Sequence, residues 1–270
     1  MPAGLSDIAA SLRSPAWLAL LFFALGMGLV VAPYSSGDAM PGGLGDPRFN
    51  AVMLEYFYRC LVAIGHGQAA HFFDAPFFYP WPLATHFSDC HWGDGLPYVL
   101  ARAAGAGKYA AFQIWFCTGF VLTYVSAYWC LRRFGLSPFG AAAGAFLFSF
   151  PLPATAQYGH AQLLYRLFVP PAMLAFDRAV TRRDRTAGAA CFLFTALQYA
   201  MTIYIGYFLV LLFGAYLIAM AWSRRLSRPL APPPARRPVA AAAMLIAGLA
   251  VFALVALPYF RVQEIYGFAR

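Results

Sequence analysis

The sequence predicts an all-α polytopic membrane protein with about seven transmembrane helices and a long first outer loop. Three observations support this fold class. Of the 270 residues, 62% are hydrophobic and only 11% are charged, whereas soluble domains carry roughly 25% charged residues. Apolar runs of membrane-spanning length recur along the chain. The net charge of +9 comes mainly from arginines in short segments between these runs. That distribution is typical of topology determinants and argues against a nucleic-acid partner.

Six stretches are free or nearly free of charge, and a spanning helix needs roughly 20 such residues. They are Pro15–Pro33, Tyr109–Leu131, Leu136–Ala156, Ala161–Phe176, Thr186–Trp222 and Val239–Leu257. The fifth is too long for one helix across a hydrocarbon core about 30 Å thick. It is also more polar around Gln198, Thr202 and Gly206. We therefore expect a hairpin of two helices there, which brings the total to seven spans.

The basic residues predict the orientation. With the N-terminus in the cytoplasm, Arg13, Arg132, Arg133, the segment "RAVTRRDR" and the Pro-rich linker "RRLSRPLAPPPARR" all fall on the cytoplasmic side. A single span in place of the hairpin would put the two most basic segments on opposite sides of the membrane. The positive-inside rule therefore supports the hairpin independently.

The acidic residues and histidines gather on the opposite, outer side. All five histidines and most of the 10 acidic residues fall there. Residues 34–108 form the first outer loop, within a single domain that comprises residues 1–270. A loop of this length is usually functional or disordered, and its many aromatic residues disfavour disorder. We therefore place the chemistry of the protein on this side.

A helix is predicted from Asp46 in the stretch "GDPRFNAVMLEYFYRC". Asp is a favoured N-cap, and Pro47 suits the first helical position. Apolar residues recur at helical spacing, while Arg48, Glu55 and Arg59 share a separate stripe. We expect an amphipathic helix on the outer membrane surface. Asp46 has two interpretations, which do not exclude each other: it caps this helix, or its ionised carboxylate acts as a general base.

Two further polar segments hold candidate site residues. In "THFSDCHWGDG", the spacing of His86, Asp89, His91 and Asp94 is compatible with a metal site. The alternative is a polar turn in which the acids brace the backbone, since no established metal-ligand signature is present.

In the segment "GHAQLLYR", His160 and Arg166 lie at the outer membrane edge. Either could contact a phosphate group, or Arg166 could instead extend its side chain to the interface. Among the five cysteines, Cys60 and Cys90 share the outer loop. They could form a disulfide in an oxidising compartment, or Cys60 could be packed on the apolar helix face.

With these residues identified, the chain resembles the N-terminal part of the GT-C superfamily of membrane glycosyltransferases. The resemblance covers the architecture of all 270 residues and the segments "GDPRFN", "FFYPWPLATHFSDCHWGDGLPY" and "GHAQLLYRLFVPP", which look like those of uncharacterised bacterial members. It implies a bacterial inner-membrane protein that transfers a hexosyl or pentosyl group on the periplasmic face. The donor would be a polyprenyl-phosphate-linked or polyprenyl-diphosphate-linked sugar, and the acceptor is unidentified.

The resemblance also implies roles for individual residues. In this superfamily an acidic residue early in the first outer loop is catalytic, usually as the base, and Asp46 stands at the matching position. Neighbouring polar groups then become candidates for substrate binding. They are Arg48, Glu55, Asp89, His91, Asp94, His160 and Arg166.

The chain departs from the superfamily pattern in three respects. Some families carry two adjacent acids, but here Pro47 follows Asp46. Some require a metal, but no decisive ligand set is visible, so the sequence requires no cofactor and is compatible with a divalent metal. Superfamily members usually have more spans and often a C-terminal outer domain. We therefore expect this chain to be an N-terminal part or a shortened member.

Two other functions fit parts of the pattern. A transporter or flippase of lipid-linked sugars is expected to hold ionisable groups along a path through the membrane, and the predicted spans are nearly free of them away from their ends. A non-catalytic membrane scaffold would explain the spans but not the one-sided clustering of polar groups.

Overall fold

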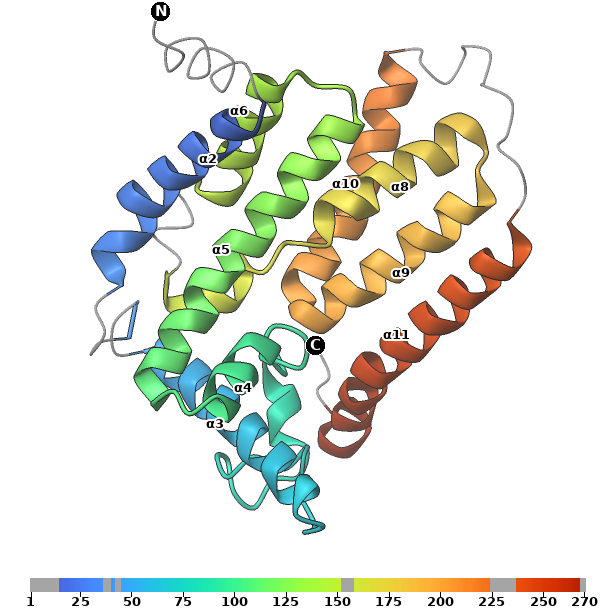
Figure 1. Ribbon diagram of the computed structural model, residues 1–270. Coiled ribbons are helices and arrows are strands. Elements are labelled where there is room, and N and C mark those ends of the chain that lie inside the picture. The colour runs from blue at the N-terminus through green and yellow to red at the C-terminus, as the bar shows by residue number, and fades with distance from the viewer. Residues whose placement is uncertain (1–14, 36–39, 42–44, 152–157, 224–236, 268–270) are drawn as a thin grey trace, which may run out of the picture.

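The computed structural model describes residues 15–35, 40–41, 45–151, 158–223 and 237–267, and all regular structure within these ranges is helical (Figure 1). The N-terminal segment with Arg13 lies outside the described residues. So does the basic, Pro-rich linker, apart from Arg237 at its end.

Four helices in the described part of the chain are long and apolar enough to cross a membrane. The first is α2 (Pro15–Gly26), which continues through a π-helical turn and a 3-10 turn as far as Tyr34. The others are α5 (Lys108–Arg133), α10 (Ile203–Trp222) and α11 (Pro238–Tyr266). Four is fewer than the seven spans expected from the sequence. The presence of these long apolar helices nevertheless indicates a membrane protein.

The remaining bundle helices are shorter. They are α6 (Pro138–Ser149), α8 (Val169–Arg182) and α9 (Arg185–Met201). The expected span Ala161–Phe176 is not one helix. Residues Tyr158–Leu164 form an irregular 3-10 segment, η4, and α8 begins only at Val169. Pro170 and Pro171 explain this boundary, because proline is tolerated in the first helical turn but disrupts a helix interior.

The fifth apolar run is divided into two helices, as its length and polarity predicted. Met201 ends α9 and Ile203 begins α10, while Thr202 between them is extended, with φ −158° and ψ 129°. Figure 1 shows α9 and α10 meeting at this break and running from it toward the same end of the molecule.

The core of the bundle lies along α5. Its buried aromatic side chains include Trp115 and Phe120. Phe120 stacks on Phe150, with ring centroids 5.4 Å apart. Tyr165 packs against Gly119, where an added Cβ would lie 3.0 Å from the tyrosine ring. The Tyr165 hydroxyl donates a hydrogen bond to the carbonyl oxygen of Trp115, 2.7 Å away. This contact fixes the connection between η4 and α8 against α5.

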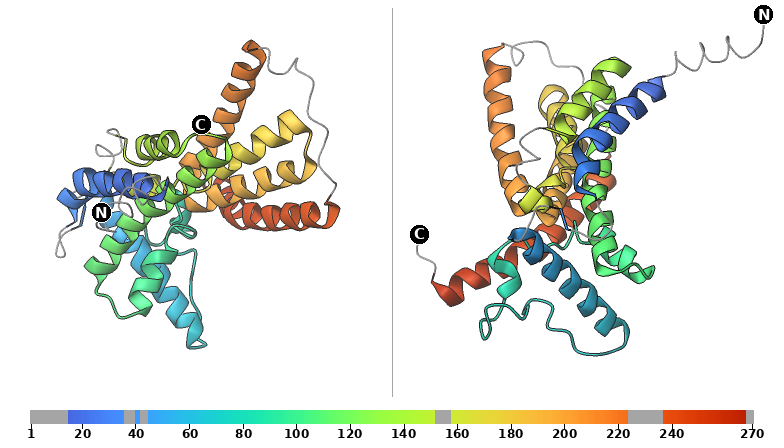
Figure 2. Two further views of the ribbon diagram at one scale, coloured as in Figure 1. Left: turned by 45° about the horizontal axis from the view of Figure 1, so that its top comes forward. Right: turned by 90° about the vertical axis from the view of Figure 1, so that its left-hand side faces the viewer.

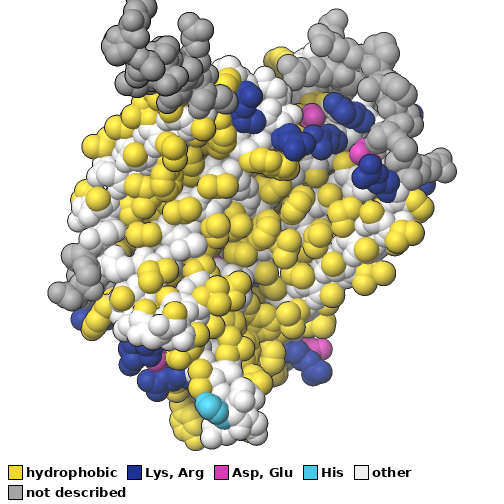
Figure 3. Space-filling model, in the orientation of Figure 1, with side chains coloured by type: hydrophobic (Ala, Val, Ile, Leu, Met, Phe, Trp, Pro, Cys, Tyr) yellow, Lys and Arg dark blue, Asp and Glu magenta, His cyan; other side chains and the backbone are white. Residues whose placement is uncertain are grey.

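One end of the molecule is built from residues 45–106. It contains α3 (Asp46–Gly65), the 3-10 turn η3 (Ala84–Phe87) and α4 (Leu96–Ala103). Figure 1 shows α2 and α11 on opposite sides of the bundle, and the C-terminal half of α11 reaches the end built from residues 45–106 (Figure 2), where Tyr259 and Tyr266 bond to Ser88 and Pro82. On the face drawn in Figure 3, Lys and Arg side chains gather toward the two ends, and hydrophobic side chains cover the helices between them. This distribution suits a bundle surrounded by lipid.

The five cysteines are all free, so the structure does not contain the Cys60–Cys90 disulfide considered above. Both thiols are buried in separate surroundings. Cys60 contacts the Tyr56 hydroxyl on its own helix, and Cys90 contacts that of Tyr259 on α11. Burial raises the pKa of the Cys90 thiol to about 12, which keeps it protonated and unreactive.

Candidate functional site

A cavity of about 480 Å³ lies between the first turns of α3, the η4 segment and the start of α10. Its lining falls into two chemical classes. Polar side chains come from α3, η4 and the loop before α4: Asp46, Asn50, Ser88, His160 and Gln162. Apolar and aromatic side chains come mainly from α10: Phe49, Leu163, Tyr204, Ile205 and Phe208. The cavity therefore has a polar side and an apolar side.

The closest polar contact at the cavity joins two residues that lie far apart in the sequence. Oδ2 of Asp46 is 2.7 Å from Nδ1 of His160, and each side chain is about half exposed. Because a carboxylate only accepts hydrogen bonds, Nδ1 carries the proton and donates it. The partner fixes the imidazole tautomer and leaves Nε2 of His160 available to a ligand.

The cap interpretation of Asp46 is wrong. Asp46 is the first residue of α3, Gly45 stands at the cap position, and no side chain bonds the free amide groups there. The carboxylate is instead paired with His160 on η4.

A second polar contact lies one helical turn further along α3. Nδ2 of Asn50 donates to Oε1 of Gln162 over 2.9 Å, and both side chains are buried. Oδ1 of Asn50 has no hydrogen-bond partner among the described residues. The sequence analysis did not identify Asn50. The available signal was its position four residues after Asp46, which places both side chains on one face of α3.

Asp89 is not part of the cavity lining and braces the break between α9 and α10. Its carboxylate accepts hydrogen bonds from the Thr202 hydroxyl (2.9 Å) and the Ile203 amide (2.8 Å). Burial raises the pKa of Asp89, and these two hydrogen bonds oppose that change only in part. The neighbouring Ser88 lines the cavity. Asp89 therefore positions the N-terminus of α10, whose first turns line the cavity.

His91 and Asp94 form a buried pair away from the cavity. Nδ1 of His91 is 2.9 Å from Oδ2 of Asp94, and both side chains are almost completely inaccessible. Burial alone would lower the pKa of His91, but the Asp94 carboxylate outweighs it and raises the pKa. The imidazole also contacts the Trp115 ring of α5, with centroids 6.0 Å apart. This pair anchors the loop on the bundle.

His86 has a third, separate environment. Its Nδ1 is 2.9 Å from the Thr85 hydroxyl, and its ring packs against Tyr259 and Trp92. Burial among these rings lowers the pKa of His86 to about 4. In the described ranges no three His, Cys, Asp or Glu side chains converge as a metal-binding group. Of the four residues whose spacing suggested a metal site, His91 and Asp94 pair with each other, while His86 and Asp89 each have other partners.

The remaining candidates also lie outside the cavity. Glu55 accepts hydrogen bonds from Tyr98 and Arg102 of α4 and from Arg59 of its own helix. It therefore connects α3 to α4. Arg166 is partly buried and lies across the Phe148 ring, with its guanidinium carbon 5.1 Å from the ring centroid, and Nη2 donates to the Ser149 carbonyl over 3.3 Å.

Arg48 is exposed on α3 and is not part of the cavity lining. Of the eight residues proposed for catalysis or substrate binding, the structure brings Asp46 and His160 together at this cavity.

Comparison with known proteins gives one match. The model of a family described as a domain of unknown function, DUF6311, matches residues 79–269. This region includes His160, Asp89 and α5 to α11, whereas α3 with Asp46 precedes it. No curated protein and no solved structure matches the chain. Because the family model matches more than half of the sequence, the chain belongs to the DUF6311 family.

Proposed function

We propose that this protein is a membrane glycosyltransferase that transfers a sugar from a polyprenyl-phosphate-linked donor to an acceptor. The observation that supports this function most directly is the Asp46–His160 pair, 2.7 Å apart, in a cavity with one polar and one apolar side. The resemblance to GT-C enzymes points to Asp46 from the sequence, and the cavity gives that residue access to a ligand.

The two sides of the cavity suit the two parts of such a donor. Asp46 and His160 line the polar side, where the sugar and phosphate would lie. Tyr204 and Phe208 line the apolar side and are exposed. The same face of α10 continues with the exposed residues Leu211 and Ile218. A polyprenyl chain could follow this face into the lipid, so that the membrane holds the donor beside the cavity.

The pair supplies two functions that glycosyl transfer needs. The acceptor hydroxyl oxygen bonds to the anomeric carbon while the bond between that carbon and the phosphate oxygen breaks. The hydroxyl proton passes to the Asp46 carboxylate, and the phosphate keeps the electron pair and remains on the polyprenyl chain. When both of its nitrogens carry a proton, the His160 imidazole can donate from Nε2 to the departing phosphate and stabilise the charge there. General base catalysis of this kind contributes about 10²–10⁴-fold to the rate.

We further propose that seven helices cross the membrane: α2, α5, α6, α8, α9, α10 and α11. The three shorter ones have 12, 14 and 17 residues, so they extend about 18–26 Å at 1.5 Å per residue. Figure 1 shows α5 running the length of the bundle, with the short α6 beside the half that leads to Arg133. In this arrangement α3 lies at the outer surface of a bacterial inner membrane, and the N-terminus is cytoplasmic.

Donor use is tested with the purified protein in liposomes that contain a radiolabelled polyprenyl-phosphate sugar. Parallel samples would carry mannosyl, glucosyl, galactosyl or arabinosyl donors, with membrane lipid extract as the acceptor source. We expect release of polyprenyl phosphate from one donor and no response to the matching sugar nucleotide. Absence of release from every lipid-linked donor would contradict the proposal.

Orientation is tested in a cysteine-free background with an impermeant thiol reagent. A cysteine at position 67, beyond α3, should react from outside intact cells. A cysteine at position 183, between α8 and α9, should react only after the membrane is opened. Labelling of position 183 in intact cells would refute the seven-span topology.

A further inference from the structure

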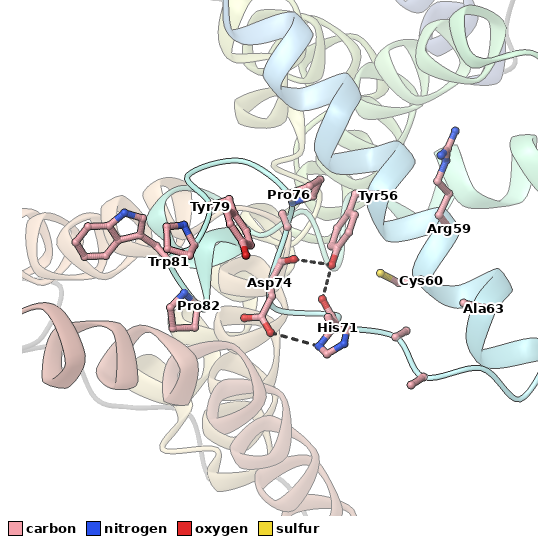
Figure 4. Close-up of a pocket in the computed structure, with 14 residues that line it drawn as sticks. Tyr56, Arg59, Cys60, Ala63, His71, Asp74, Pro76, Tyr79, Trp81 and Pro82 are labelled. Carbon is pink, nitrogen blue, oxygen red and sulfur yellow. Dashed lines mark hydrogen bonds and ion pairs between the residues drawn. The ribbon is translucent and has the colours of Figure 1, made fainter.

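A second hollow, of about 700 Å³, lies between the C-terminal half of α3 and residues 69–82 (Figure 4). Tyr56, Arg59 and Cys60 form its helical wall. His71, Asp74, Tyr79 and Trp81 come from the facing segment, together with Pro76, Pro80 and Pro82. None of these residues takes part in the cavity around Asp46, so this hollow is a separate feature.

The walls of the hollow are held in place by hydrogen bonds. The Tyr56 hydroxyl donates to the backbone carbonyls of His71 and Asp74, the latter over 2.9 Å. Oδ1 of Asp74 accepts from the Leu83 amide over 2.8 Å. These contacts fasten the segment to α3 at one end and close it on itself at the other. The segment that faces α3 across the hollow is therefore held by hydrogen bonds within the protein.

Two large aromatic rings stand at its rim and are unusually accessible. Tyr79 is 89% exposed and Trp81 is 54% exposed. The Trp81 ring is held from behind by Tyr266 of α11, with centroids 5.1 Å apart. A tyrosine and a tryptophan offer flat apolar faces with a polar edge, and both lose little conformational entropy when a ligand binds.

Polar groups lie between these rings and the helix. Figure 4 shows Asp74 and His71 in the middle of the hollow, with Trp81 on one side and Arg59 on the other. Oδ2 of Asp74 and Nδ1 of His71 are 3.8 Å apart, and both side chains are accessible to solvent. They can accept and donate hydrogen bonds to a ligand without being released from a buried network.

We propose that this hollow binds a neutral saccharide. The C–H faces of a sugar ring stack on flat aromatic rings, and its hydroxyl groups both donate and accept hydrogen bonds. The Asp74 carboxylate disfavours a phosphate or another anion beside it, and the Arg59 guanidinium in the opposite wall is already paired with Glu55. Aromatic rings that only anchor a protein in the membrane interface need no hollow lined with an acid, a histidine and an arginine.

The position of the hollow relates it to the cavity. Both are built on α3, the cavity on its first turns and the hollow on its later turns. Phe49 lines the cavity and packs against Phe77, with centroids 5.2 Å apart, on the segment that leads into the hollow. If the proposed transfer is correct, the hollow holds the part of the acceptor that lies away from the reacting hydroxyl. Binding itself does not depend on that reaction.

The test is saturation-transfer difference NMR on the purified protein in lauryldimethylamine oxide, because a maltoside detergent could itself occupy the site. The probes are maltotriose, cellotriose, mannotriose and chitotriose, without any donor. We expect transfer to ring C–H protons of at least one probe. Binding should weaken at least about tenfold in Trp81→Ala and in Tyr79→Ala, as for central aromatic contacts.

The matched control is Trp222→Ala, because Trp222 is 89% exposed at the far end of α10. This variant should bind the probe as the wild type does. Absence of signal with all four probes, or an unchanged signal in the Trp81→Ala and Tyr79→Ala double variant, would overturn the proposal. Brominated-lipid quenching of the part of the tryptophan emission that Trp81→Ala removes, with no saccharide signal, would assign the rings to the membrane interface. A failed donor assay leaves the binding result unaffected, so the two proposals fail separately.

Discussion

The carboxylate of Glu55 allows a comparison of two arginines that bind it in different surroundings. Arg102 of α4 donates to it over 3.0 and 3.4 Å, and its side chain is 20% exposed. Arg59 donates over 3.0 Å from the next turn of α3, and its side chain is 66% exposed. The structure therefore predicts that Glu55 stabilises the α3–α4 end mainly through Arg102.

The expected magnitudes follow from exposure. An exposed i, i+4 ion pair contributes about 0.3–0.5 kcal/mol, which is our expectation for Glu55–Arg59. The partly buried Glu55–Arg102 contact has two charge-assisted hydrogen bonds, and its coupling free energy should reach about 1.5 kcal/mol. Burial alone would raise the pKa of Glu55, but hydrogen bonds from Arg102, Arg59 and Tyr98 outweigh it and lower the pKa. The contribution should thus be complete above about pH 4.5 and decline at lower pH.

The assay is a pair of double-mutant cycles on the free energy of unfolding in detergent. One cycle combines Glu55→Gln with Arg102→Met, and the other combines it with Arg59→Met. The account predicts the larger coupling for Arg102 at pH 7 and a smaller difference at pH 4. Equal couplings, or a Glu55→Gln variant with wild-type stability and lost substrate binding, would refute the structural role given to Glu55.

Two further predictions concern the loop between α3 and α4. Burial lowers the pKa of His86 from 6.5 to about 4, so the neutral ring stabilises the fold above pH 6.5, and about 3 kcal/mol should be lost as the pH falls to 4. His86→Gln should flatten the dependence of melting temperature on pH in this range, and an unchanged dependence would contradict the burial of His86. An added Cβ at Gly93 would lie 2.8 Å from the Ala200 carbonyl oxygen, so Gly93→Ala should cost about 1–3 kcal/mol. At Gly188 the nearest atom is 3.9 Å away, so Gly188→Ala should not destabilise; equal melting temperatures for the two variants would refute the close packing.

Hydrophobicity and chain breakers predicted much of the helical arrangement. The polar residues around Thr202 correctly located the break between α9 and α10. Pro170 and Pro171 indicate that α8 starts only near Val169. A count of apolar residues alone instead predicted a fourth span that included the residues of η4. Helix breaks of this kind can be predicted from the sequence because proline acts on the backbone of neighbouring residues.

The site could be predicted only as separate residues. Asp46 and His160 each stood out as polar groups beside apolar runs, but their contact joins segments more than 100 residues apart and depends on how α3 packs. The spacing of His86, Asp89, His91 and Asp94 left a metal site and a polar turn both open for a similar reason. The backbone takes positive φ angles at Leu83 (60°) and His91 (56°), and these turns direct neighbouring side chains to different partners.

The most direct test of the proposed function compares polyprenyl-phosphate release by the wild type and by Asp46→Asn in liposomes. Because Asp46 makes no capping hydrogen bond through its side chain, the substitution should leave folding intact. Glu264→Gln is the matched control, since Glu264 is an exposed acid at the same end of the molecule. It lines neither the cavity around Asp46 nor the hollow beside Trp81. We predict that Asp46→Asn slows release about 10²–10⁴-fold, as expected for loss of a general base, while Glu264→Gln keeps the wild-type rate. Release by Asp46→Asn at nearly the wild-type rate would contradict the assignment of Asp46 as the catalytic base.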